Sequence, residues 1–123
     1  ERVIEFFKEA RDLNSSYGFT FVWEARGWVG SDELVSVLKK FDIVHCTDVL
    51  RNEPSYLSSK NLLYARLHGF GKKSMYDYKF SDEELAKVKQ VLSKFKPKQA
   101  YVLFNNFYMY EDALRFKEML SKD

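Results

Sequence analysis

The stretch Asn61-Leu-Leu-Tyr-Ala-Arg-Leu-His-Gly69 decides the fold of this chain. An apolar run of this length, bounded by turn residues, is typical of a buried β-strand. Because side chains alternate between the two faces of a strand, Tyr64, Arg66 and His68 point to the same side. The strand therefore finishes with an arginine and a titratable histidine on one face. That end of a parallel strand is where α/β folds bind their ligands.

The composition is that of one globular domain. The chain has 123 residues, of which 46% are hydrophobic and 31% charged. These values fit a single domain over residues 1–123 and argue against disorder. The net charge of +2 is too small to indicate nucleic-acid binding by itself. The single cysteine, Cys46, excludes an internal disulfide and favours a cytoplasmic location.

The sequence shows no sign of a membrane or secretory segment. Its apolar runs are all shorter than the roughly 20 residues that a membrane helix needs, and it has no signal-peptide pattern. The chain begins at Glu1 and not at Met, which suggests a fragment or a processed chain.

Helix and strand patterns alternate along the chain. Apolar residues at helical spacing predict helices over residues 1–13, 32–40, 81–95 and 111–120. Runs rich in β-branched and aromatic residues predict strands over 19–25, 43–46, 62–67 and 100–104. Polar stretches predict loops over 47–60 and 69–80. This order predicts an α/β fold of parallel strands with the helices packed outside.

Polar side chains stand at the end of every predicted strand. In chain order they are Glu24 and Arg26, then Asp48, then Arg66 and His68, and finally Asn105 and Asn106. If the strands are parallel and adjacent, these side chains gather on one rim. A solvated strand end explains any one of them equally well, but it explains the whole set less well.

The chemistry of this rim suits a small anionic ligand. Arg26 and Arg66 are able to clamp carboxylate or phosphate oxygens. His68 titrates near neutral pH and suits general acid or base catalysis. Glu24 is either a second base or the ion-pair partner that orients Arg26. Asn105 and its neighbour Asn106 would orient a substrate, and Asp48 is a further candidate for substrate binding.

A metal site is weakly indicated. The spacing of His45, Cys46, Asp48 and His68 matches no zinc motif. Asp48 and Glu24 would be able to hold magnesium through water, but nothing requires it. The sequence therefore predicts no metal and identifies no cofactor.

A phosphate loop and a nucleic-acid surface are the remaining alternatives. The segment Gly69–Ser74 lacks the G-x-x-x-x-G-K-[ST] spacing of a phosphate loop, so a flexible loop is the better interpretation. Its Lys72 and Lys73, with Tyr76 and Tyr78, leave a nucleic-acid-binding module open as an alternative.

Three segments resemble the motifs of a known family: Trp23-Glu-Ala-Arg26 with Trp28, Tyr64-Ala-Arg-Leu-His-Gly69, and Tyr101-Val-Leu-Phe-Asn-Asn106. They resemble the patterns E-x-R-x-x-x-W, Y-x-R-x-H-G and Y-x-x-F-N-N of the YecE-like family (domain of unknown function seventy-two). The first pattern is compressed here, because Trp28 stands only two residues after Arg26. The resemblance spans about residues 1 to 120.

The resemblance implies the carboxyl-terminal half of a TIM-type (β/α)8 barrel, with a site on its polar rim. A full barrel needs roughly 250 residues. The implied partner is therefore the amino-terminal half of the barrel or a second copy of this chain, because open sheet edges are prone to associate. The expected function is an enzyme, a hydrolase or another acid/base catalyst acting on a small phosphate or carboxylate substrate. The alternatives are a nucleic-acid-binding module and a half-barrel assembly protein without catalysis.

Overall fold

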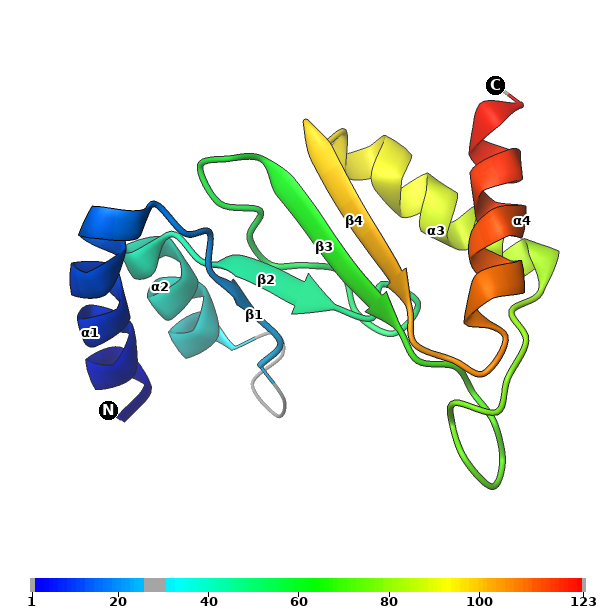
Figure 1. The fold of residues 1–123 in the computed structure, drawn as a ribbon, viewed down its shortest axis with the longest axis horizontal. Coiled ribbons are helices and arrows are strands. Elements are labelled where there is room, and N and C mark those ends of the chain that lie inside the picture. The colour runs from blue at the N-terminus through cyan, green and yellow to red at the C-terminus, as the bar shows by residue number, and fades with distance from the viewer. Residues whose placement is uncertain (1, 26–30, 123) are drawn as a thin grey trace.

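The computed structural model describes residues 2–25 and 31–122. Helices and strands follow one another in the predicted order, as Figure 1 shows. The elements are α1 (Arg2–Tyr17), β1 (Val22–Trp23), α2 (Asp32–Phe41), β2 (Val44–Thr47), β3 (Leu62–Leu67), α3 (Asp82–Phe95), β4 (Gln99–Phe104) and α4 (Met109–Ser121).

The four strands form one parallel sheet in the order β1-β2-β3-β4. Each strand therefore lies beside its neighbour in sequence, as in half of a (β/α)8 barrel. One connection departs from strict alternation, because residues 48–61, all of which the structure describes, join β2 to β3 without a helix. The α/β fold of parallel units predicted from the sequence is confirmed.

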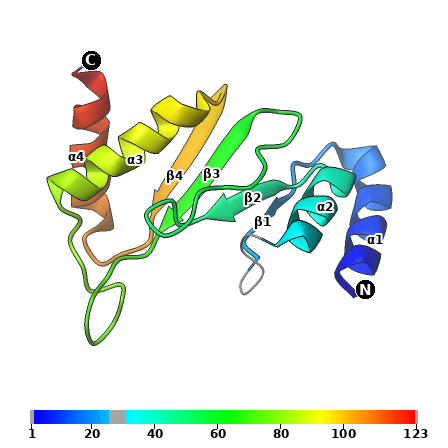
Figure 2. The ribbon, with the colours of Figure 1, turned by 180° about the vertical axis from the view of Figure 1, so that it is seen from behind.

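The two faces of the sheet differ in what they contact. Leu63, Ala65 and Leu67 of β3 belong to a buried core that includes Leu85 of α3 and Phe116 of α4. The alternate residues of β3 and β4 face the other way, where Tyr101 keeps 51% and Leu103 39% of its surface exposed. Figure 2 shows α3 and α4 on the β4 side of the sheet and α1 and α2 on the β1 side.

A second core joins α1 and α2 to the first two strands. Phe7 of α1 and Phe41 of α2 belong to it, and their ring centroids are 5.9 Å apart. The ring of Phe7 also lies 5.4 Å from that of Trp23. Trp23 thus packs against α1.

Most helix boundaries follow local capping chemistry. The Ser81 hydroxyl accepts a hydrogen bond from the backbone N–H of Glu84, whose carboxylate accepts one from the N–H of Ser81, and this capping box begins α3 as predicted. Ser31 caps α2 in the same position. None of the helices in the described part of the chain has the length and apolar content of a membrane-spanning segment.

The amino-terminal region differs from the prediction. The helix predicted over residues 1–13 is longer in the structure, because α1 continues to Tyr17, and Gly18, with φ +69°, follows it. The Asn14 amide then donates to the Phe19 carbonyl at 2.8 Å and closes the helix end. The strand expected over 19–25 shortens to Val22–Trp23, because only these residues pair with β2.

Candidate functional site

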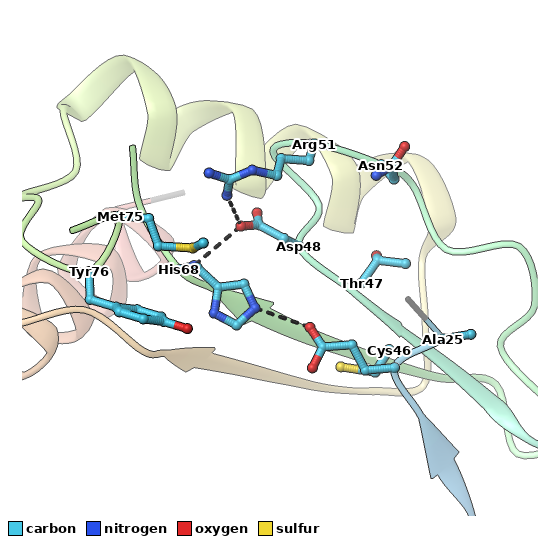
Figure 3. A pocket seen from close by; sticks show the side chains of 10 residues that line it. Ala25, Cys46, Thr47, Asp48, Arg51, Asn52, His68, Met75 and Tyr76 are labelled. Carbon is cyan, nitrogen blue, oxygen red and sulfur yellow. Dashed lines mark hydrogen bonds and ion pairs between the residues drawn. The ribbon is translucent and has the colours of Figure 1, made fainter. Parts of the chain in front are cut away.

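A cavity of about 290 Å³ opens where β1, β2 and β3 end. Figure 3 shows its side chains converging from these strands and from the loops that follow them. The lining residues are Glu24, Ala25, Cys46, Thr47, Asp48, Arg51, Asn52, His68, Met75 and Tyr76. The volume lies at the lower end of the range for ligand pockets, so the cavity suits a small molecule.

A carboxylate, a guanidinium and an imidazole meet across the sheet. Arg66 Nη1 donates to Glu24 Oε1 at 2.5 Å. The Nε2 of His68 lies 3.0 Å from Glu24 Oε2. Glu24 follows β1, whereas Arg66 and His68 belong to or follow β3, so the carboxylate reaches across β2 to both of them. The shared face predicted for Arg66 and His68 follows from the alternation of β3.

The second nitrogen of His68 meets the side chain of Asn105, which follows β4. Asn105 Nδ2 lies 3.3 Å from His68 Nδ1. If the amide donates to Nδ1, the ring proton lies on Nε2, where it is donated to Glu24. The ring of Tyr76 stands edge-on to the imidazole, with 5.9 Å between centroids. His68 is thereby oriented by neighbours on three sides.

Burial and charge act in opposite directions on Glu24. Burial alone raises the pKa of Glu24, but the hydrogen bond to His68 and the positive charge of Arg66 outweigh it, so the pKa lies below the ordinary value. Glu24 is therefore ionised at neutral pH. Burial, together with the charge of Glu24, raises the pKa of the Cys46 thiol to about 11. Cys46 is consequently no nucleophile under ordinary conditions.

Asp48 and Arg51 form the other side of the cavity. Asp48 Oδ2 accepts hydrogen bonds from Arg51 Nη1 at 2.5 Å and from the backbone N–H of His68 at 3.2 Å. Its Oδ1 accepts from the N–H of Leu50 at 3.1 Å. Arg51 Nη2 donates to the carbonyl of Gly69 at 2.5 Å. Asp48 thus joins the loop after β2 to the end of β3.

The predicted site residues fall into three groups. Glu24, Arg66, His68 and Asn105 form one connected network, which adjoins Asp48 through the backbone of His68. Asn106 lies in a different network. Arg26 lies outside the residues that the structure describes.

Asn106 supports the loop between β3 and α3. Its Nδ2 donates to the Tyr78 carbonyl at 2.7 Å and to Asp112 Oδ2 at 2.9 Å. Asp112 also accepts from the N–H of Phe80 at 3.0 Å and from Arg115 Nη1 at 2.9 Å. Asn105 is therefore the asparagine that faces His68, a point that the sequence alone left open.

The residues that sequence reasoning missed lie in the two loops. Arg51 stands in a polar, irregular stretch, and no pattern in the sequence distinguishes it from a solvated arginine. Met75 and Tyr76 follow β3 in the second loop, where no sequence pattern places them at the cavity. No group of three or more His, Cys, Asp or Glu side chains within 2–25 and 31–122 is arranged to hold a metal ion.

Comparison with known proteins gives one match. The model of a family described as a protein of unknown function, DUF72, matches residues 6–123. No curated protein and no solved structure matches the chain.

Proposed function

The chain belongs to the DUF72 family, and because that family's description names no activity, we propose from the geometry of the site that the protein is an acid/base enzyme acting on a small anionic substrate. The observation that carries this proposal is that Glu24, which follows β1, contacts both Arg66 and His68 at the end of β3, and that Glu24 and His68 line one cavity. Such rims are where (β/α)8 enzymes hold their catalytic groups.

His68 is the proposed proton-transfer group. With Nε2 bonded to Glu24, the nitrogen that exchanges a proton with the substrate is Nδ1, which now meets Asn105 at 3.3 Å. That contact is long, so a substrate atom is able to replace it. The ionised Glu24 stabilises the imidazolium that forms when His68 accepts a proton. Asn105 then orients the substrate.

Arg66 has two proposed effects. Its charge keeps Glu24 ionised, and it adds to the positive potential that attracts an anion. About a third of its side chain, 34%, remains exposed. Arg26 was also predicted to bind the anion, and it stays a prediction.

The test is a titration with glycerol 3-phosphate, followed through the ring resonances of His68 by ¹H–¹⁵N NMR. We expect a saturable shift in the native protein and an affinity about tenfold lower after Arg66→Ala, because a charge-assisted contact is lost. Lys98→Ala serves as the control, since this exposed lysine precedes β4 at the opposite end of the sheet. Equal affinity in the native protein and Arg66→Ala would contradict the role of Arg66. A His68 ring that does not respond at all would contradict the proposed function.

We also propose that another polypeptide covers the open side of the sheet. Tyr101 and Leu103 of β4 are exposed there, and β4 pairs with β3 on one side only among the described residues. Exposed strand edges favour pairing with another chain. The amino-terminal half of a barrel and a second copy of this chain both fit this surface.

A further inference from the structure

The strongest feature that the proposed function does not use is Arg51. It follows β2, lines the cavity and keeps 35% of its side chain exposed. In Figure 3 it lies at the opposite end of the cavity from Ala25 and Cys46, with His68 between them. Arg51 is therefore a cation in the same cavity as the acid/base pair, but apart from it.

The guanidinium of Arg51 is held in place from several directions. Asp48 Oδ2 and the Gly69 carbonyl each accept one of its hydrogen bonds at 2.5 Å. Its Cζ lies 4.2 Å from the centre of the Phe70 ring. A side chain that is already fixed loses little conformational entropy when a ligand binds. Arg51 is thus positioned before any ligand arrives.

The guanidinium of Arg51 has N–H groups left to bind a ligand. A guanidinium has five N–H groups, and the bonds to Asp48 and Gly69 occupy only two of them in the described part of the chain. Asp48, by contrast, is only 8% exposed and accepts from Arg51, Leu50 and the His68 backbone. The group that presents itself to a ligand on this side is therefore the arginine, not the carboxylate.

We infer that Arg51 binds the anionic group of the substrate directly, while His68 and Glu24 act on a second part of the same molecule. Asp48 Oδ2 bridges Arg51 and the backbone of His68, at 2.5 and 3.2 Å, so the two ends of the site are close. The substrate class is a small molecule whose phosphate or carboxylate stands only a few atoms from the reacting group. This inference rests on the proposed function for the role of His68, but not for the anion contact.

The experiment compares two probes by NMR of the native protein. Inorganic phosphate is expected to shift the side-chain N–H resonances of Arg51. Glycerol 3-phosphate, which adds a three-carbon arm, is expected to shift Arg51 and His68 together. A His68 response without an Arg51 response would overturn the inference and leave the proposed function standing. An Arg51 response to both probes, with no His68 response to glycerol 3-phosphate, would support the anion contact and contradict the proposed function.

Two variants separate anion binding from support of the loop. Arg51→Gln is expected to weaken phosphate binding about 10- to 100-fold, because charge-assisted contacts are lost, and Arg51→Lys is expected to fall between it and the native protein. Lys94→Gln is the matched control. Lys94 of α3 pairs with Glu53, which lies in the same loop as Arg51, but this ion pair is on the surface, with 2.8 Å between Nζ and Oε1. Native-like phosphate affinity in Arg51→Gln would overturn the inference. If Arg51→Gln does not fold, the Arg51 resonances of the native protein decide the question.

Discussion

At the scale of single residues, the site depends on how Glu24 is shared. One carboxylate oxygen bonds Arg66 and the other bonds His68. The imidazole of His68 therefore has a fixed anionic neighbour, and the negative charge of Glu24 is compensated by Arg66. Neither contact is between neighbours in sequence, because Glu24 lies 42 positions from Arg66 and 44 from His68. The fold, and not local structure, creates the pair.

Glu24 should make the stability of the protein depend on pH. Its pKa is lower in the folded protein than in the unfolded chain, so its contribution is present above the unfolded pKa and is lost as the pH falls through the folded pKa. We expect Glu24→Gln to lower the free energy of unfolding by about 1 to 2 kcal/mol at pH 7. The difference from the native protein should shrink as the solution is made more acidic.

Urea unfolding at a series of pH values measures this effect. Glu9→Gln, at an exposed position of α1, is the control and should leave the pH dependence unchanged. A constant difference between the native protein and Glu24→Gln from neutral to strongly acidic solution would show that Glu24 is not stabilised by its ionised state.

How far the sequence predicts the site depends on the residue. Glu24, Arg66, His68 and Asn105 stand at strand ends, and the parallel pairing of adjacent strands, which the order of elements predicts, brings such residues to one rim. Arg51 was not predictable, because a loop has no periodicity that fixes where a side chain points. Its position follows from Asp48, three residues away, and from the Gly69 carbonyl, a contact that exists only after β2 and β3 have paired.

At the scale of elements, the sequence predicts best those helix boundaries at which a side chain caps the helix. The capping box at Ser81 and the cap at Ser31 fixed the starts of α3 and α2. The boundaries that differ are set by pairing. β1 is short because only Val22 and Trp23 pair with β2, and a propensity for strand cannot show how much of a segment finds a partner.

Asp112 connects the elements around the second loop. It is fully buried at 0% exposure and accepts hydrogen bonds from Phe80, Asn106 and Arg115. We expect Asp112→Ala to cost about 3 to 5 kcal/mol in the free energy of unfolding, because the donors of Phe80 and Asn106 lose their buried acceptor and Arg115 loses one of its two carboxylate partners. Denaturant unfolding measures the loss.

The neighbouring Glu111 is the control for that experiment. Its contact with Lys79 is a surface ion pair at 3.9 Å, so Glu111→Gln should change the stability by less than about 1 kcal/mol. Similar losses in Asp112→Ala and Glu111→Gln would mean that the buried network adds little to the attachment of α4.

At the scale of the whole molecule, the open face of the sheet should control association. Tyr101 is 51% exposed on the edge strand β4. We expect Tyr101→Lys to shift the chain toward smaller particles, because a lysine on a strand edge opposes pairing with another chain. Light scattering coupled to size exclusion measures the particle mass.

Gln90→Lys adds the same charge on the exposed side of α3 and should leave the mass unchanged. A native protein that is monomeric at all concentrations would contradict the proposed covering of this face. If the native protein associates, mass spectrometry of the same fraction shows whether the partner is a second copy or a different polypeptide.

The burial of the Cys46 thiol determines how this residue reacts with electrophiles and oxidants. With a pKa of about 11, only about one molecule in ten thousand carries a thiolate at pH 7. The residue is also only 3% exposed, between β1 and β3. Electrophiles and peroxides therefore have almost nothing to attack while the sheet is intact. Modification of Cys46 by such reagents would therefore report that the sheet around it had opened.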